Sequence, residues 1–212
     1  MRRRTVEIDF RHGHHHLGGA LSALPIIAEI YAEMDLEHDV FILSKGHASA
    51  AWYAVLEAYG YQPDVTCLHP ERTLRNDDAP DTTGVHFTTG SLGHGLPMAV
   101  GIALGKQLRG DPGNVYVVLG DGEAMEGTTW ESLLLARRYK LHDRLHVHLD
   151  NNGWQGFGAV QDDTPALASQ IYPVKVHTRP KGFGVKLYQD NPDWHVHWMT
   201  EPEFEQILRE LK

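Results

Sequence analysis

The chain has 212 residues, of which 42% are hydrophobic and 22% charged, and its formal net charge is −9 at pH 7 with histidine neutral. This balance excludes a disordered chain, and the negative charge excludes a general nucleic-acid binder. No apolar run approaches the ~18 residues that a membrane span needs. The single cysteine, Cys67, excludes an internal disulfide framework and is typical of a reducing compartment. We therefore expect a cytoplasmic protein with no nucleic-acid or membrane partner.

Apolar spacing and turn residues predict the elements of the first half of the chain. In chain order they are a helix over 21–34, a short buried strand over 40–43, a helix over 48–59 and a long loop over 61–90. Pro25 is compatible with the first helix only in its first turn. A loop of that length, with turn formers at 76–78 and 80–81, is uncommon unless it has a function.

The second half alternates strands and helices. In chain order we predict a helix over 94–108, a strand over 115–119, a helix from Thr128, a strand over 145–149 and a helix over 201–211. The pattern also predicts, more weakly, strands over 174–177 and 184–188, of which the one over 184–188 is better supported. Thr128 with Glu131, and Thr200 with Glu203, have capping-box spacing. The strand–helix–strand order predicts one α/β domain over 1–212, a three-layer fold with helices on both faces of a mostly parallel sheet.

Polar residues follow two of the predicted strands. Gly120-Asp121-Gly122 comes directly after the strand at 115–119, and Asn152 lies just beyond the strand at 145–149. Because parallel strands end at the same edge of a sheet, the Asp121 carboxylate and the Asn152 amide should point to one place. With the carbonyl of Trp154 and phosphate oxygens they would make an octahedral Mg²⁺ site, with Ca²⁺ or Mn²⁺ as alternatives. Gly122 leaves room for a phosphate near backbone N–H groups.

These turns and several further blocks, in the same order, resemble the transketolase family, and most of all its separate half-length N-terminal subunits. The blocks are His16–Ser22, Ser44–Ala48, His69-Pro70-Glu71, Thr88–Gly95, Gly120–Gly127 with Asn151-Asn152, Lys181–Gly184 and Trp194-His195. The resemblance covers nearly the whole chain. It implies the diphosphate-binding domain of a thiamine diphosphate enzyme.

The resemblance also implies roles for individual residues. The metal would be held by Asp121, Asn152 and the Trp154 carbonyl, and the diphosphate would be met by Gly120, Gly122, His47 and His195. Gly90 would contact the aminopyrimidine ring and Leu92 the thiazolium ring, while Glu126 would lie at a subunit interface near the cofactor. The catalytic histidines of the sugar channel would be His16, His47, His69 and His195. Imidazoles suit such a channel because they donate hydrogen bonds to developing oxyanions and move protons near neutral pH.

The implied reaction is transfer of a two-carbon ketol unit between sugar phosphates, as in the pentose phosphate pathway. The pyrimidine-binding domain, whose glutamate activates the cofactor in this family, is not among these residues. We therefore expect a hetero-oligomer with a C-terminal, pyrimidine-domain transketolase subunit. Two alternatives stay open: a subunit of another thiamine diphosphate enzyme (1-deoxyxylulose phosphate synthase-like or a split decarboxylase), and a reduced, non-catalytic binding partner.

The sequence departs from the family pattern in several places. The stretch between Gly158 and Lys181 is short, so we expect a strand and covering helices to be missing there. Gly156 lacks the branched side chain expected beside the thiazolium. Other departures and histidines without an assigned role are Leu68 in place of glycine, His94 in place of glutamine, His12, His14 and His15 as loop histidines, and His146 with His148 on one face of a strand.

Overall fold

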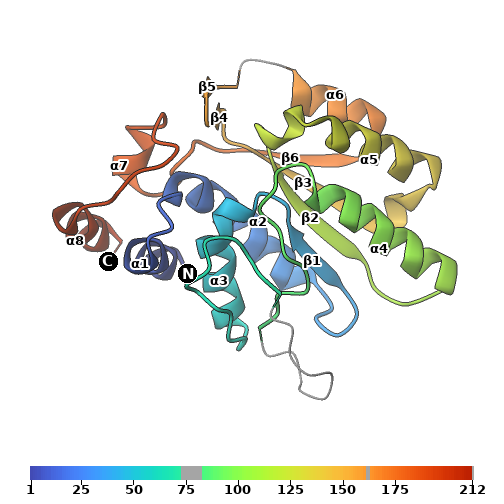
Figure 1. The fold of residues 1–212 in the computed structure, drawn as a ribbon, viewed down its shortest axis with the longest axis horizontal. Coiled ribbons are helices and arrows are strands. Elements are labelled where there is room, and N and C mark those ends of the chain that lie inside the picture. Colours follow the sequence, from blue (N-terminus) through green and yellow to red (C-terminus); the bar gives the residue numbers. More distant parts are fainter. Residues whose placement is uncertain (73–82, 161–162, 212) are drawn as a thin grey trace.

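A parallel sheet lies between two layers of helices, which confirms the predicted three-layer α/β fold (Figure 1). The computed structural model describes residues 1–72, 83–160 and 163–211. The sheet has the order β1-β2-β3-β6, and each neighbouring pair is parallel; its strands are β1 (Val40–Leu43), β2 (Val115–Gly120), β3 (Leu145–Asn151) and β6 (Val174–Thr178). All four carboxyl ends therefore lie at one edge.

The two faces of the sheet pack against different helices because side chains alternate along a strand. Phe41, Leu43 and Val118 pack with α1 (Arg2–His12), α2 (Leu17–Glu33) and α3 (Ser49–Ala58). Ile42, Val117 and Leu119 pack on the other face with α4 (Gly95–Arg109), α5 (Gly127–Arg138) and α6 (Thr164–Ile171). Burial on both faces explains why the strand at 115–119 reads as continuously apolar.

Short elements complete the chain around this frame. They are the 3₁₀ turns η1 (Gly46–Ala48), η2 (Glu123–Met125) and η3 (Leu141–Asp143), the hairpin of β4 (Trp154–Gln155) and β5 (Gly158–Ala159), and the helices α7 (Lys186–Gln189) and α8 (Glu201–Glu210). A third apolar cluster, which includes Val6, Leu17, Val185 and Phe204, joins α1 and α2 to α7 and α8. Among the described residues, no helix is long and apolar enough to cross a membrane.

Several local predictions are wrong. The stretch 184–188 forms the end of a turn and the first residues of α7 instead of a strand, because Val185 and Tyr188 bury their side chains against α1 and α8 and not in the sheet. The stretch between Gly158 and Lys181 still supplies a helix and a strand, α6 and β6, so the sheet keeps a fourth strand. In the loop at 61–90, no helix or strand occurs over 61–72 or 83–90, and the turn formers at 76–78 and 80–81 lie outside the described residues.

The helix starts differ from the predicted ones in two places. The first predicted helix begins earlier, at Leu17, so Pro25 lies inside α2 and not in its first turn. Helix α5 begins at Gly127, and the Thr128 hydroxyl donates to the carbonyl of Gly93 at 2.7 Å instead of closing a capping box. The capping box of α8 is confirmed, since the Glu203 carboxylate accepts from the backbone N–H of Thr200 at 2.7 Å.

Gly113, in the turn before β2, is a position where we expect a large loss of stability. Its φ is +84°, and a Cβ there would lie 2.1 Å from the carbonyl oxygen of His38. Gly110 has a similar φ of +71° with nothing within 4 Å of its Cβ position, so it is a matched control. We expect G110A to cost about 1–2 kcal/mol, from the left-handed conformation alone. G113A should cost more than about 3 kcal/mol in urea unfolding, because the backbone itself must move. Equal losses would contradict this account of Gly113.

Candidate active site

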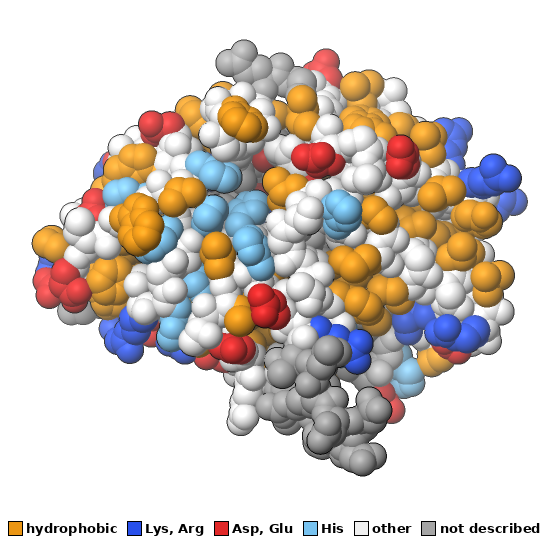
Figure 2. Space-filling model, viewed as in Figure 1, with side chains coloured by type: hydrophobic (Ala, Val, Ile, Leu, Met, Phe, Trp, Pro, Cys, Tyr) orange, Lys and Arg blue, Asp and Glu red, His pale blue; other side chains and the backbone are white. Residues whose placement is uncertain are grey.

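A cavity of about 520 Å³ opens at the carboxyl ends of the strands. Ten of the twelve residues singled out in the sequence line it: His16, His47, Leu92, Gly120, Asp121, Gly122, Glu126, Asn152, Trp154 and His195. Figure 2 shows imidazoles gathered beside a hollow on this face of the molecule. The predicted site residues therefore come together in space, although their individual roles stay predictions.

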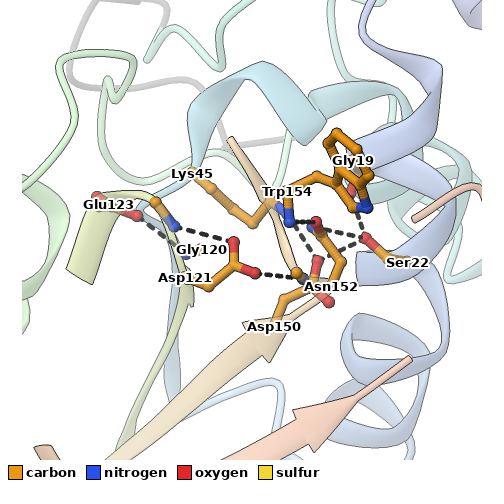
Figure 3. Close-up of polar contacts among 11 residues, drawn as sticks. Gly19, Ser22, Lys45, Gly120, Asp121, Glu123, Asp150, Asn152 and Trp154 are labelled. Atoms are coloured by element: carbon orange, nitrogen blue, oxygen red, sulfur yellow. Dashed lines mark hydrogen bonds and ion pairs between the residues drawn. The ribbon is translucent and has the colours of Figure 1, made fainter. Parts of the chain in front are cut away.

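The two turns that follow β2 and β3 are tied together by the Asp121 carboxylate (Figure 3). Its Oδ2 accepts the backbone N–H of Gly153 at 2.6 Å, and its Oδ1 accepts that of Gly122 at 2.9 Å. Burial raises the pKa of Asp121, against the opposing effect of the Lys45 charge. A poorly solvated carboxylate next to the Asn152 amide is an oxygen-rich place that favours a cation.

The donor set at this place fits a hard cation held partly by phosphate. Over 1–72, 83–160 and 163–211, no group of three or more His, Cys, Asp or Glu side chains is arranged to hold a metal ion. A carboxylate, an amide oxygen and a backbone carbonyl thus need further oxygen ligands to complete a shell of six. Phosphate oxygens in the cavity would supply them.

Three histidines form one wall of the cavity. The ring centroid of His16 lies 5.5 Å from that of His47 and 5.3 Å from that of His195, and the latter two are 5.8 Å apart. Burial lowers the pKa of His47 well below its ordinary value and that of His195 to about 4. Both are therefore neutral at pH 7, and each offers one N–H donor and one acceptor nitrogen.

His69 and Gly90, also singled out in the sequence, do not line the cavity, but they lie against each other. A Cβ on Gly90, whose φ is +148°, would lie 2.8 Å from Cγ of His69. A Cβ on Gly46 would lie 2.8 Å from the Gly90 nitrogen. Gly90 thus packs against the turn that carries His47, and this close backbone approach explains glycine at position 46. At position 90, the positive φ and the His69 side chain explain it.

Two lysines in the cavity were not assigned a role from the sequence, although both stand in blocks that carry the resemblance. Lys45 donates to the Asp150 carboxylate at 2.7 Å. Lys181 is 3% exposed, and its Nζ has no hydrogen-bond partner among the described residues. Burial lowers the pKa of Lys181 to about 8. An unpaired buried ammonium is costly, and an anion bound in the cavity would supply the missing partner.

Gly122 adjoins the β4–β5 hairpin. A Cβ on Gly122 would lie 2.7 Å from Cβ of Gln155, so the missing side chain makes room for that hairpin. A Cβ on Gly156 would lie 3.6 Å from the His195 ring. The hairpin therefore closes one side of the cavity next to the histidine wall.

Apolar side chains surround the mouth of the cavity. Leu92, Met125 and Phe157 line it and are 37%, 54% and 102% exposed. Exposed large apolar residues around a pocket are typical of a surface that another chain covers.

The histidines without an assigned role include two that are buried. His14 and His15 lie in the loop between α1 and α2, as predicted, whereas His12 is the last residue of α1. His14 is nevertheless 1% exposed, and its Nε2 lies 2.9 Å from the carbonyl oxygen of Val65. His146 and His148 lie on the same strand, and Nδ1 of the buried His148 is 3.0 Å from Nε2 of His177 on β6. Burial lowers the pKa of His14 to about 4 and that of His148 to about 3.

These pKa shifts predict that the unliganded chain loses stability in acid. Below a pH of about 6.5 the unfolded chain binds protons that folded His14 and His148 refuse, so stability present above that pH is lost as the pH falls towards 4. Asp9 opposes this, because burial raises its pKa to about 7, and so do Asp121 and Glu123, whose pKa values burial also raises. The lowered pKa values of His47 and His195 add to the loss in acid. We expect the free energy of unfolding in urea to fall between pH 7 and 5. H148Q should reduce the slope by up to about 1.4 kcal/mol per pH unit, and an unchanged slope would contradict the assignment.

The fold and the cavity together define an α/β protein whose cavity, at the carboxyl edge of a parallel sheet, is suited to an anionic ligand. The family model described as "Transketolase, thiamine diphosphate binding domain" matches residues 13–166. The chain belongs to this family, and it is the N-terminal, thiamine diphosphate-binding part of a transketolase-type transferase.

Curated relatives agree with the family match. The chain is 31% identical over 93% of its length to an apulose-4-phosphate transketolase subunit of Actinobacillus succinogenes, and covers 87% of that protein. It is 36% identical over 78% of its length to the 6-deoxy-6-sulfo-D-fructose transketolase subunit SqwG of a Clostridium species, and covers 64% of it. It covers only 33% of the human transketolase, at 29% identity.

Solved structures confirm the fold. The transketolase of Leishmania mexicana superposes with a TM-score of 0.73 over 98% of this chain and 42% of its own, at 23% identity. That of Campylobacter jejuni gives 0.66 over 99% of this chain and 42% of its own, at 19% identity. The predicted family, fold class and transferase activity are thus confirmed. The metal and the pentose phosphate pathway stay predictions.

Proposed function

We propose that this chain binds thiamine diphosphate with a divalent cation and, together with a second subunit, transfers a two-carbon ketol unit between sugar phosphates. The observation that carries the proposal is the meeting of the Asp121 and Asn152 turns in a cavity that also holds the Lys181 ammonium, which has no hydrogen-bond partner among the described residues. Oxygen ligands for a cation and a free positive charge for a phosphate lie in one place.

The cavity residues divide between the two ends of the cofactor. Asp121, Asn152 and the Trp154 carbonyl would hold Mg²⁺, with Lys181 at the diphosphate. When bound, thiamine diphosphate supplies the electron sink that ketol transfer requires. Leu92, at the apolar rim, would lie beside the cofactor rings.

The histidine wall would serve the sugar. Neutral His47 and His195 can each donate a hydrogen bond to a sugar oxygen and accept a proton at the other nitrogen. His16, within 5.5 Å of both rings, extends the wall towards the channel. Neutral imidazoles in a buried site are suited to hold oxygens that gain charge during C–C bond cleavage.

A second subunit is required by this proposal. The apolar mouth formed by Leu92, Met125 and Phe157 is the surface that we assign to it. Relatives that this chain covers almost completely are themselves named subunits, which supports a split enzyme. The partner would be the C-terminal, pyrimidine-domain subunit, and the assembly a hetero-oligomer.

The substrates are sugar phosphates, or anionic sugars of similar shape. The relatives are named for apulose 4-phosphate and for a sulfofructose, so related chains differ in the sugar named. The matched family favours ketol transfer over decarboxylation or 1-deoxyxylulose phosphate synthesis.

Calorimetry and reconstitution test the proposal. Thiamine diphosphate should bind the chain with Mg²⁺ present and bind much more weakly after chelation with EDTA. Ketol transfer should require the partner subunit, and a panel of xylulose 5-phosphate, apulose 4-phosphate and 6-deoxy-6-sulfofructose as donors would identify the substrate. Binding without activity on any donor, in a complete complex, would favour a non-catalytic partner. No binding would reject the proposal.

A further inference from the structure

A buried chain of hydrogen bonds links the Asn152 amide to Ser22, Asp150 and Lys45 (Figure 3). Asn152 Nδ2 donates to Ser22 Oγ at 3.3 Å, and the Ser22 hydroxyl donates to Asp150 Oδ2 at 2.7 Å. Lys45 Nζ donates to the same carboxylate oxygen at 2.7 Å. Ser22, Asp150 and Lys45 are 0%, 0% and 1% exposed. These groups come from α2, the end of β3 and the turn after β1, so the fold brings them together.

The direction of the hydrogen bonds in this chain is fixed by what each group can do. The Asp150 carboxylate, paired with the Lys45 ammonium, is an acceptor only. The other neighbour of the Ser22 hydroxyl, the carbonyl oxygen of Gly19 at 3.2 Å, is also an acceptor. The single hydroxyl hydrogen of Ser22 therefore points to these two acceptors, Asp150 and Gly19. The Ser22 oxygen must then accept a hydrogen bond from Asn152.

This direction decides which end of the amide faces the cavity. Because Ser22 Oγ accepts, Asn152 must present its NH₂ group to Ser22 and its carbonyl oxygen Oδ1 to the other side. There Oδ1 accepts the backbone N–H of Trp154 at 3.1 Å, and in the part of the chain that the structure describes its second lone pair has no donor, so it could bind a cation. In the reverse orientation the NH₂ group would face the cation, and the site would lose one ligand.

We propose that Ser22 and Asp150 are positioning residues that hold the Asn152 amide with its oxygen towards the metal. Lys45 pairs with the same oxygen of the fully buried Asp150 carboxylate that accepts from Ser22. The inference rests on the proposed function, in which Asn152 is a metal ligand. It extends the site by three residues that do not touch the metal.

The test is a double-mutant cycle between Ser22 and Asn152 on the full chain. S22A should raise the Kd for Mg²⁺, measured by calorimetry at saturating thiamine diphosphate, about 10–100-fold. In the N152D background the same change should cost less than about 3-fold, since a carboxylate has an oxygen at both ends. S49A, which removes another buried serine hydroxyl, one that donates to the carbonyl of Leu68 and is not part of this chain of hydrogen bonds, should change the Kd by less than about 2-fold.

The outcomes separate positioning from packing. An equal loss of Mg²⁺ affinity in both backgrounds would mean that Ser22 only packs, and no loss in S22A would also overturn the inference. If S22A does not fold, S22C decides in the same cycle, because it keeps the shape but is a poor acceptor. Wild-type protein that binds neither Mg²⁺ nor thiamine diphosphate would overturn the proposed function and this inference together. If the wild type binds both and S22A has the same Kd for Mg²⁺, the inference alone is overturned.

Discussion

Replacing Asp121 by alanine is expected to lower the affinity for thiamine diphosphate, with Mg²⁺ present, at least about 100-fold, which is about 2.8 kcal/mol. The change removes a carboxylate from the cation shell and also the acceptor that holds Gly153, at 2.6 Å, in the neighbouring turn. Both the ligand and the geometry of Asn152 are thus affected. Calorimetry with and without Mg²⁺ measures the effect.

Two further variants make the Asp121 result specific. D121N keeps one oxygen and the shape of the side chain, so it should bind more weakly than wild type and more tightly than D121A. D143A removes a carboxylate that is 90% exposed, and it should bind as wild type does. Unchanged affinity in D121A would refute the cation assignment, even if other residues still bound the cofactor.

The fold could be predicted where the pattern of the chain is local. The strands at 40–43, 115–119 and 145–149 carry continuous or alternating apolar residues, and the structure confirms each of them. The stretch 184–188 carries a similar pattern, yet it forms α7, because what surrounds Val185 and Tyr188 is a helix cluster and not a sheet. Which neighbours bury an apolar run is a long-range property that spacing does not contain.

The position of the site could be predicted from the sequence, but the contacts of its buried lysines could not. Asp121 and Asn152 follow strands, so topology alone places them together. The roles of the buried lysines depend on contacts between distant parts of the chain: Lys45 meets Asp150, and the stem of Lys181 packs on Gly18, where a Cβ would lie 3.1 Å from Lys181 Cε. The sequence motifs that contain the two lysines could be recognised. Whether each ammonium has a hydrogen-bond partner could not be predicted from them.

Replacing Lys181 is expected to have two opposite effects, higher stability of the unliganded chain and weaker binding of the cofactor. Its ammonium is buried without a partner among the described residues, so the unliganded chain bears the cost of desolvating it. K181M keeps most of the stem and removes the charge. We therefore expect K181M to stabilise the unliganded chain by about 1–2 kcal/mol in urea unfolding, since buried unpaired polar groups cost about that much in proteins.

The same substitution should weaken the cofactor complex. Thiamine diphosphate would lose a charged hydrogen bond to its diphosphate, so we expect its Kd with Mg²⁺ to rise at least about 10-fold. K175M is the control, because the exposed Lys175 on β6 forms a surface ion pair with Glu29, so the substitution should change neither quantity by much. Destabilisation by K181M with unchanged affinity would mean that Lys181 is structural. If K181M is more stable when unliganded and binds thiamine diphosphate more weakly, Lys181 is an anion-binding residue. Its buried charge is then unfavourable in the unliganded chain and becomes favourable when the ligand supplies a partner.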